Sequence, residues 1–350
     1  MSLQGPFNDI CILRLSAIGD VCHAVSAVQA IQRHYPNAKI TWVVGKIEAM
    51  LLADLPGVEL VVFDKKQGKA AYHSLKEHFK GRQFDVLLHM QVALRANLAA
   101  RVIPAKVKVG FDWNRAKEGH FLFTNHRIAA EKEAHVLEGF RGFAKAIGVP
   151  HYEPSWQMPV SEDDRSYAKE TLSPLGDKVL VLSPAASKAE RNWLPERYAE
   201  IADYAVQQGF TVVITGGPTE LEVTLAKQIE NAMKSTALNL VGKTNLKQLL
   251  CVLESASLVI APDTGPAHMA VTMGTPVIGL YAHSNPARTG PYLYQDYVVE
   301  VYYQNLKKQT GKTATQLPWG TRVKGKDLMQ QISVGSVKEM FDRVVNEKAL

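Results

Sequence analysis

Hydrophobic residues occur along this chain in short continuous runs, which alternate with longer segments of helical spacing. The runs predict β-strands at 10–15, 39–44, 60–63, 84–89, 178–183, 210–215, 257–260 and 275–280. Helical spacing predicts helices at 24–31, 195–208, 246–256 and 334–347. Strands that lack polar alternation are buried on both faces, so the pattern indicates parallel sheets covered by helices on each side.

The alternation of strands and helices stops near residue 150 and restarts at residue 178, and the stretch between them is rich in proline and acidic residues. We therefore expect one Rossmann-like domain at 1–160, a linker at 161–177 and a second Rossmann-like domain at 178–333. The C-terminal helix within 334–350 could pack on either domain. The pattern of strands and helices thus predicts an α/β fold of two doubly wound sheets. Ligands are expected where the carboxyl ends of the strands face a cleft.

The length of 350 residues, with 46% hydrophobic and 21% charged residues, is enough for two globular cores. No apolar run approaches the roughly 20 residues that span a bilayer, and residues 1–5 lack the pattern of a signal peptide. The three cysteines have no metal-ligand spacing, and their odd number argues against a disulfide framework. We expect a cytoplasmic protein in which Cys11 and Cys251 are buried thiols.

The net charge of +6 and the isoelectric point near 9.0 favour an acidic partner, such as a nucleic acid. Lysine and arginine are spread along the chain without a basic block or an RNA-binding signature, so we expect no nucleic-acid partner. A moderate positive balance suits an acidic small substrate or an anionic membrane surface equally well.

The most informative motif is Ala-Pro-Asp-Thr-Gly-Pro-Ala-His-Met-Ala at 261–270, which links a predicted strand to a helix. Asp263 or Thr264 is well suited to cap that helix, and Gly265 allows a ligand close to the backbone. The free N–H groups and the dipole of the helix start form an anion site, with His268 one turn inside. The motif predicts a phosphate cradle; the alternative is an ordinary capped helix after a buried strand.

The first strand is followed by a turn that contains Ser16 and Gly19 and by Asp20 at the start of a helix. Asp20 is a candidate general base for an acceptor hydroxyl. The alternative is a first-turn carboxylate that only complements the helix dipole. His23, one turn further on, is interpreted as a structural or neighbouring group.

The loop after the strand at 178–183 offers a hydroxyl and two cations, from Ser187, Lys188 and Arg191. A fixed cation stabilises the negative charge that grows on a diphosphate leaving group. The alternative for Arg191 is a surface cation that rests on the indole of Trp193. The dinucleotide fingerprint Gly-x-Gly-x-x-Gly and the P-loop motif are absent, which disfavours a nicotinamide dehydrogenase and a P-loop nucleotidase.

Three of these motifs resemble glycosyltransferase family 9, the bacterial heptosyltransferases. They are the segment 263–270, the stretch Leu-Arg-Leu-Ser-Ala-Ile-Gly-Asp-Val at 13–21, and the basic-x-Trp-x-Pro loop at 191–195. The resemblance covers nearly the whole chain in the same order. The opening and the stretch 111–117 look most like the enzymes that add the first heptose. The resemblance implies a GT-B fold of two Rossmann-like domains that face a central cleft.

The resemblance also implies roles for individual residues. Asp20 matches the proposed general base, and Arg191 a basic position near the donor phosphates. The matching donor-binding positions are Ser187, Lys188, Glu220 (ribose), Lys243 and Thr244 (adenine), Asp263, Thr264, Gly265 and His268. Arg95 and Lys117 match basic positions that would bind an anionic acceptor, or they are solvated surface charges. Gly139 stands where arginine is common, so one acceptor cation is missing or is replaced by Arg141.

The activity implied is an inverting, metal-independent transfer of L-glycero-D-manno-heptose from ADP-heptose to Kdo of the lipopolysaccharide inner core. The sequence contains no Asp-x-Asp pair of the kind used by metal-dependent transferases, and no cofactor is implied. The partners implied are ADP-heptose and a Kdo–lipid A acceptor, with peripheral contact at the cytoplasmic face of the inner membrane. The alternatives are a later-acting heptosyltransferase, another family 9 transferase, or a non-catalytic protein that binds an ADP-sugar.

Overall fold

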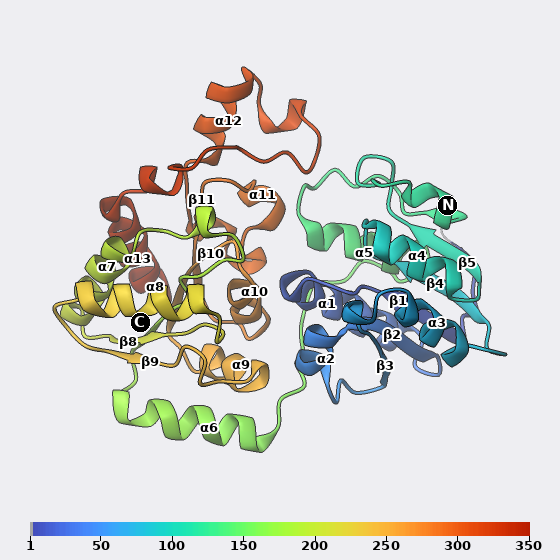
Figure 1. The fold of residues 1–350 in the computed structure, drawn as a ribbon, viewed down its shortest axis with the longest axis horizontal. Coiled ribbons are helices and arrows are strands. Elements are labelled where there is room, and N and C mark those ends of the chain that lie inside the picture. The colour runs from blue at the N-terminus through green and yellow to red at the C-terminus, as the bar shows by residue number, and fades with distance from the viewer. Residues whose placement is uncertain (1–2) are drawn as a thin grey trace. The chain divides into compact units, whose positions relative to one another are not determined.

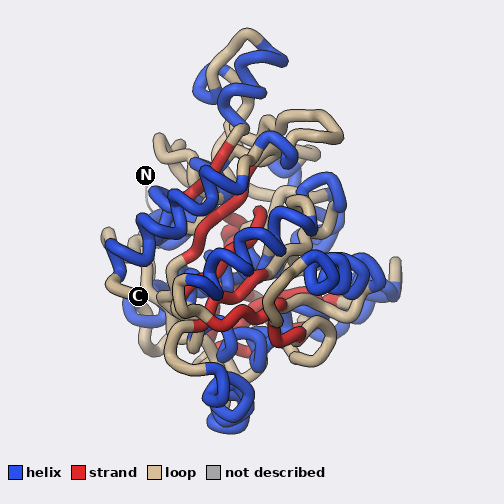
Figure 2. Tube along the Cα trace, turned by 90° about the vertical axis from the view of Figure 1, so that its left-hand side faces the viewer, coloured by secondary structure: helices blue, strands red, loops and turns tan. Residues whose placement is uncertain are grey.

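A computed structural model describes residues 3–350 of the chain. The chain divides into two compact units, residues 1–159 and 160–350, and each contains one parallel sheet (Figure 1). The strands run between layers of helices (Figure 2). We describe each unit by itself.

The first unit holds a six-stranded sheet in the order β3-β2-β1-β4-β5-β6, and all of its neighbouring strands are parallel. Its strands are β1 (Asp9–Leu13), β2 (Lys39–Gly45), β3 (Val58–Phe63), β4 (Phe84–His89), β5 (Ala105–Gly110) and β6 (His126–Arg127). Its helices are α1 (Ile18–His34), α2 (Lys46–Leu52), α3 (Lys69–His78), α4 (Leu94–Val102) and α5 (Val136–Ala146), with short 3₁₀ turns η1 (Lys65–Gln67) and η2 (His120–Phe123).

The central strand β1 is apolar on both faces because each face is covered by helices. Ile10 and Ile12 pack into a cluster that includes residues of α1 and α5. Cys11 and Leu13 point to the other face, into a cluster that includes residues of α3 and α4. Both faces of β1 are therefore buried from Ile10 to Leu13.

The second unit holds another six-stranded parallel sheet, in the order β12-β11-β10-β7-β8-β9. Its strands are β7 (Val179–Leu182), β8 (Thr211–Ile214), β9 (Ala237–Asn239), β10 (Leu258–Pro262), β11 (Val277–Tyr281) and β12 (Val298–Glu300). Its helices are α6 (Glu162–Leu172), α7 (Pro195–Gln207), α8 (Glu220–Ala232), α9 (Leu246–Glu254), α10 (Gly265–Thr272), α11 (Pro286–Thr289), α12 (Tyr302–Thr310) and α13 (Val334–Lys348). Short 3₁₀ turns are η3 (Ser173–Leu175), η4 (Ala189–Arg191), η5 (Tyr292–Tyr297), η6 (Ala314–Gln316) and η7 (Met329–Gln331).

The C-terminal helix α13 packs on the second unit, a choice that the sequence left open. Phe341 is fully buried in the core cluster of that unit, and its ring lies 5.2 Å from the ring of Phe210. Tyr204 on α7 donates a hydrogen bond to Asp342 at 2.8 Å. Apolar burial and this bond join α13 to α7 and the sheet.

The prediction that residues 161–177 form a linker is wrong, because most of this segment is helical and belongs to the second unit. Ser161 and Asp164 form a capping box, in which the Ser161 hydroxyl accepts from the Asp164 N–H at 3.1 Å and the Asp164 carboxylate accepts from the Ser161 N–H at 3.1 Å. Arg165 pairs with Glu254 of α9. The acidic residues that suggested a linker are therefore the first turn of α6.

All of the predicted strands and helices are present, with shifted ends. The strands β5, β6, β9 and β12 were not predicted. β5 carries Lys106 and Lys108 among its valines, and its burial is partial. β6, β9 and β12 have only two or three residues each. They lie at the edges of the sheets, where a strand has a hydrogen-bonded neighbour on one side only. Such short elements have no period from which to predict them.

Cys11, Cys22 and Cys251 are buried free thiols, as predicted for the first and the last. Within residues 3–350 the structure contains no helix with the length and the apolar character needed to cross a bilayer.

Candidate active site

The predicted donor-binding residues follow four neighbouring strands of the second sheet. Because the strands are parallel, the segments after β10, β7, β8 and β9 all begin at the end of the sheet where the carboxyl ends of the strands lie. We call this end the carboxyl edge. These segments carry Asp263, Thr264, Gly265 and His268 after β10, Ser187, Lys188 and Arg191 after β7, Glu220 after β8, and Lys243 and Thr244 after β9. The topology thus aligns all of the predicted donor-binding residues along one edge.

A charged cluster lies at the start of α10. The Asp263 carboxylate lies 3.7 Å from Arg191 Nη1 and 3.8 Å from His268 Nε2. Burial acts to raise the pKa of Asp263, but the neighbouring His268, Ser284 and Arg191 outweigh it, so the net pKa is lowered. Asp263 therefore stays ionised at neutral pH and attracts both the guanidinium and the imidazole.

The expectation that Asp263 or Thr264 caps α10 through its side chain is wrong. Thr264 occupies the N-cap position, but its hydroxyl donates to the Ala185 carbonyl at 3.1 Å. Asp263 instead faces Arg191 and His268. The first N–H groups of α10 are thus not satisfied by a cap from either side chain, as an anion site at a helix start requires.

The loop after β7 places its groups in different surroundings. Ser187 and Lys188 are exposed, whereas the Arg191 side chain is only 13% exposed and faces Asp263. Trp193 is buried and donates its indole N–H to the Ile332 carbonyl at 3.0 Å. Trp193 is therefore a core residue. The contact that holds Arg191 is the ion pair with Asp263.

Two glutamates of α8 have different roles. Glu222 accepts from the Gly217 N–H at 2.7 Å and from the Thr219 hydroxyl at 2.5 Å, so it shapes the turn after β8. Glu220 is exposed and lines a pocket of about 550 Å³. The predicted ribose ligand is therefore the carboxylate of this turn that is open to solvent.

Lys243 and Thr244 precede α9. The Lys243 ammonium donates to the Asn239 carbonyl at 2.7 Å, and the Lys243 carbonyl accepts from Tyr167 at 3.3 Å. With its side chain and carbonyl engaged, this segment is held in place by β9 and α6. It can therefore offer a nucleobase such as adenine a fixed backbone rather than a mobile cation.

The predicted acceptor-side residues follow three neighbouring strands of the first sheet. Asp20 follows β1, Arg95 follows β4 and Lys117 follows β5, and these strands are adjacent and parallel. All three positions thus lie beyond the carboxyl edge of the sheet.

Asp20 is held by two contacts at one oxygen. Its Oδ2 pairs with Arg14 and accepts from the Ala17 N–H at 3.3 Å. Arg14 is buried, donates to the Met90 carbonyl at 2.6 Å and lies 5.4 Å from the centre of the Phe140 ring. The Asp20 side chain is 32% exposed. Among residues 3–350, both contacts use Oδ2, so Oδ1 is left for a ligand.

The side chain of Gln91 holds the β1–α1 turn. Gln91 accepts from the Leu15 N–H at 2.7 Å and donates to the Ser16 hydroxyl at 3.3 Å.

The ring of His23 is buried edge-on to that of His135, with centroids 5.1 Å apart. His23 is therefore a packing group between α1 and α5, which agrees with its structural interpretation.

Arg95 and Lys117 are exposed, and they belong to segments that are tied together. The Glu118 carboxylate accepts from the Leu94 N–H at 2.5 Å, and Asn97 donates to the Glu118 carbonyl at 2.9 Å. The start of α4 and the loop that carries Lys117 therefore form one local structure.

A buried His–Asn–His cluster lies beneath that structure. The Asn97 carbonyl oxygen lies 2.9 Å from His89 Nε2 and 3.1 Å from His120 Nδ1. His120 Nε2 accepts from the Phe111 N–H at 3.1 Å, so this nitrogen carries no proton. A Cβ at Gly110 would lie 2.6 Å from the same nitrogen, so the chain at this position requires glycine.

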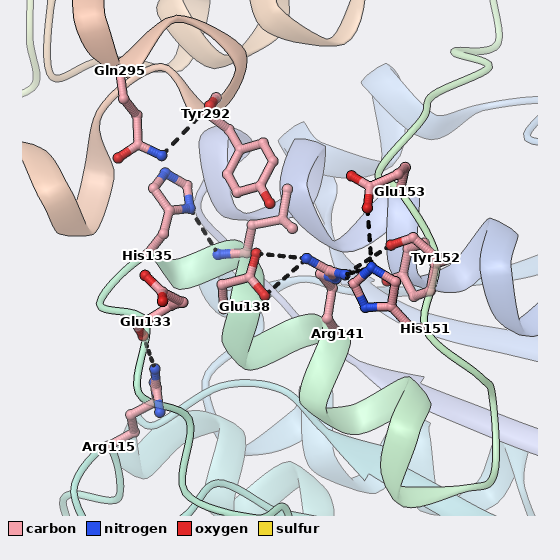
Figure 3. Close-up of polar contacts among 11 residues, drawn as sticks. Arg115, Glu133, His135, Glu138, Arg141, His151, Tyr152, Glu153, Tyr292 and Gln295 are labelled. Carbon is pink, nitrogen blue, oxygen red and sulfur yellow. Dashed lines mark hydrogen bonds and ion pairs between the residues drawn. The ribbon is translucent and has the colours of Figure 1, made fainter.

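The suggestion that Arg141 replaces a missing acceptor cation is not supported. Arg141 donates to Glu138 at 3.0 Å and to the Tyr152 carbonyl at 2.9 Å, and it lies 2.9 Å from His151 (Figure 3). Its charge is therefore balanced inside the unit. At Gly139, a Cβ would lie 3.1 Å from Phe111 Cε1, so no larger residue fits without a shift of the ring.

Arg115 is also structural. It is buried and pairs with Asp112 at 2.8 Å. It also donates to the Glu133 carbonyl at 2.7 Å (Figure 3). Among residues 3–350, no group of three or more His, Cys, Asp or Glu side chains could hold a metal ion.

The family model of glycosyltransferase family 9 (heptosyltransferase) matches residues 72–318. The chain is 47% identical over 330 residues to the lipopolysaccharide core heptosyltransferase OpsX of Haemophilus influenzae, and the match covers 94% of this chain and 95% of that protein. The chain belongs to glycosyltransferase family 9. The resemblance seen in the sequence is thereby confirmed, and the protein is an enzyme of this heptosyltransferase family.

Other members of family 9 are more distant. Lipopolysaccharide heptosyltransferase 1 of Escherichia coli K12 is 24% identical over 313 residues, which cover 85% of this chain and 95% of that protein. A family 9 transferase from Veillonella parvula superposes with a TM-score of 0.79 at 22% identity, over 97% of both chains. Escherichia coli heptosyltransferase WaaC with ADP superposes with a TM-score of 0.72 at 22% identity, over 96% of this chain and 99% of that one. These likenesses confirm the GT-B fold.

The family 9 motifs do not include every residue that lines the edge. His283 and Ser284 follow β11 and line a small cavity with Arg191 and Asp263. His283 Nδ1 lies 3.1 Å from the Val323 carbonyl, and its buried Nε2 meets no hydrogen-bond partner among residues 3–350. The sequence signal was a pair of polar residues that begins three positions after the predicted strand 275–280. For Arg14, the signal was a basic residue inside an otherwise apolar strand.

We expect the buried histidines to make the first unit of this family 9 enzyme sensitive to acid. Burial lowers the pKa of His120 to about 4, and the pKa of His89 also lies well below its usual value. The unfolded chain has His pKa values of about 6.5 and binds more protons, so stability is full above about pH 6.5 and is lost as the pH falls toward about 4. For His120 alone this loss is on the order of 3 kcal/mol.

We expect urea unfolding followed between pH 7 and pH 4 to show this loss. The His120→Gln variant, which does not titrate, should show a shallower fall in the free energy of unfolding across that window. The exposed His73 of α3 provides the control, because His73→Gln should keep the wild-type slope. Equal slopes for wild type and His120→Gln would show that this group does not cause the acid sensitivity.

Proposed function

We propose that this enzyme transfers L-glycero-D-manno-heptose from ADP-heptose to Kdo of the lipopolysaccharide inner core, as heptosyltransferase I does. The transfer inverts the anomeric centre and uses no metal. The single observation that carries the proposal is the cluster of Arg191, Asp263 and His268 at the start of α10, which offers the Arg191 cation and helix N–H groups to a diphosphate.

Relatives support the substrates. The Haemophilus relative at 47% identity is named for the lipopolysaccharide core. WaaC has been solved with ADP and with ADP-2-deoxy-2-fluoro heptose, which supports an ADP-heptose donor here. The donor-side residues Ser187, Lys188, Glu220, Lys243 and Thr244 would bind the rest of the nucleotide sugar. Peripheral contact with the cytoplasmic face of the inner membrane follows from an acceptor that is a lipid.

On the acceptor side, Asp20 takes the proton of the Kdo hydroxyl as that oxygen attacks the anomeric carbon. The Arg14 contact and the Ala17 N–H fix Oδ2, so Oδ1 can accept the proton without a search among rotamers. Arg14 is a positioning residue in this scheme. Arg95 and Lys117 are the exposed cations that would bind anionic groups of the acceptor.

On the donor side, the C–O bond to ADP breaks as the new bond forms, and negative charge grows on the β-phosphate. Arg191 and the first N–H groups of α10 stabilise this charge. Asp263 does not have to meet the phosphate, because its ionised carboxylate can act by orienting Arg191 and His268. This role removes the conflict between a carboxylate and a diphosphate at one site.

Two alternatives make different predictions. A later-acting heptosyltransferase would use the same donor and a heptosylated acceptor. A non-catalytic protein would bind ADP-heptose and form no product. Incubation of the purified enzyme with ADP-heptose and Kdo₂–lipid A, followed by linkage analysis of the product, tests the proposal; transfer only to a heptosylated acceptor would favour the first alternative.

Replacement of Asp20 by asparagine should lower kcat by about 10²–10⁴-fold, because a general base typically contributes that much. Glu48 provides the control, since its carboxyl follows the neighbouring strand β2 and burial raises its pKa. We expect Glu48→Gln to stay within about threefold of wild type in a transfer assay. If Glu48→Gln abolished transfer and Asp20→Asn did not, Asp20 would not be the base.

Replacement of Arg191 by alanine should lower kcat by about 10²–10³-fold and change ADP affinity by only a few fold, because the cation acts mainly on charge that develops in the transition state. The Arg191→Lys variant keeps a charge and should recover part of the loss. Steady-state kinetics with calorimetry of ADP binding separates the two effects. A raised KM at an unchanged kcat would assign Arg191 to ground-state binding.

ADP should raise the Tm of the enzyme, whereas UDP and NAD at equal concentration should not. A ligand present at about 100 times its Kd stabilises the protein by about 2.7 kcal/mol. The Glu220→Ala variant should show a smaller shift with ADP, because a ribose contact is lost. Differential scanning fluorimetry measures all four cases, and a shift specific to UDP would point to another donor.

A further inference from the structure

An exposed apolar surface covers part of the first unit. Five of the eleven large hydrophobic side chains that are exposed among the described residues lie between residues 94 and 122. They are Leu94 (56% exposed), Leu98 (37%), Trp113 (63%), Phe121 (44%) and Leu122 (73%), and we call them the α4–η2 patch. Exposed hydrophobic residues scattered singly are ordinary, but a group of this kind marks an interaction surface.

The members of the α4–η2 patch are neighbours in space. The rings of Trp113 and Phe121 lie 5.6 Å apart. Leu122 and Arg101 line one surface pocket, and α4 packs against η2. Leu94, Leu98 and Arg101 are spaced by four and three residues on α4, so they share one face of that helix.

The patch rests on a rigid base. η2 begins at His120, which is buried and bound to Asn97 and to the Phe111 N–H. Glu118 joins the same segment to the first residue of α4. The exposed rings and leucines are therefore presented by ordered backbone and pay little entropy on binding.

The charge around the patch is positive. Arg95, Arg101 and Lys117 are exposed, and none of them forms an ion pair with any residue from 3 to 350. The Arg127 guanidinium lies 3.9 Å from the centre of the Trp113 ring. The nearby carboxylate of Glu118 is occupied by a backbone N–H, and Asp112 is paired with the buried Arg115.

We propose that the α4–η2 patch is the surface by which this enzyme docks on an anionic lipid bilayer. Tryptophan and phenylalanine partition into the interfacial region, and leucine enters the acyl boundary. Arginine and lysine next to them pair with anionic headgroups, to which each contributes attraction within a Debye length. Apolar side chains ringed by unpaired cations match a membrane surface, whereas the core of a protein interface is depleted of charge.

This inference deepens the proposed function, since a lipid-linked acceptor would be met at such a surface. It can still be tested separately, because binding to vesicles requires neither ADP-heptose nor Kdo. If vesicles bind and no sugar is transferred, the docking surface stands and the proposed reaction falls.

The test is co-sedimentation of the full chain with sucrose-loaded vesicles of phosphatidylcholine and phosphatidylglycerol. We expect the double variant Trp113→Ser with Leu122→Ser to bind at least about tenfold more weakly than wild type. The control is Met50→Ser, because Met50 on α2 is 55% exposed and lies outside the patch. This control should bind as wild type does. Thermal unfolding of each variant confirms that these surface substitutions leave the fold intact.

A second arm tests the charges. Arg101→Gln should weaken binding to the anionic vesicles by about fivefold, since one basic residue is worth about 1 kcal/mol near such a surface. Binding should fall as salt is raised and should be weak with phosphatidylcholine alone.

Three results would overturn the proposal. Wild type that does not bind anionic vesicles would do so, as would equal binding by wild type and the double variant. The third is a dimer in solution that the double variant converts to monomer without change in vesicle binding, which would identify the patch as a contact between copies of this chain.

Discussion

The burial of both faces of each parallel sheet constrains where this enzyme can place its chemistry. β1 sends Ile10 and Ile12 to one helix layer and Cys11 and Leu13 to the other, which leaves no polar side chain between these four positions. In parallel sheets covered on both faces, ligands are met where the strands end. The candidate residues of both units accordingly follow strands that are adjacent and parallel, and the common direction of those strands brings their loops to one edge.

At each edge, the charged groups are held by one another before any ligand arrives. Asp20 is tied through Oδ2 to Arg14, which is itself fixed by the Met90 carbonyl. Asp263 attracts Arg191 and His268, and its lowered pKa keeps it ionised. A pre-formed ion pair loses little freedom when substrate binds, and this is the physical basis of catalysis by positioning. The two sites share this logic although their sequences differ.

The first unit also contains a buried cluster of a different kind. The buried pair His89 and His120 shares the Asn97 oxygen, and one His120 nitrogen accepts a backbone N–H, so the cluster requires an unprotonated imidazole. On this support rest Arg95, Lys117 and the exposed residues of the α4–η2 patch. Recognition of an anionic acceptor and contact with a lipid surface would thus depend on the same buried hydrogen bonds.

The periodicity of apolar residues by itself determined the fold class and the long elements, because buried strands and amphipathic helices are local patterns. The motifs by themselves determined the family and placed Asp20, Arg191 and His268 at strand ends. Only the tertiary structure decided which partner each polar group takes. It placed Asp263 against Arg191 and His268 instead of at a helix cap, and it paired Arg141 with Glu138. It also folded most of residues 161–177 into α6, which an ion pair between Arg165 and Glu254 joins to α9 of the second unit. Such choices depend on side chains that are distant in the sequence, and the free energy of a charge is set by its neighbours in space rather than along the chain.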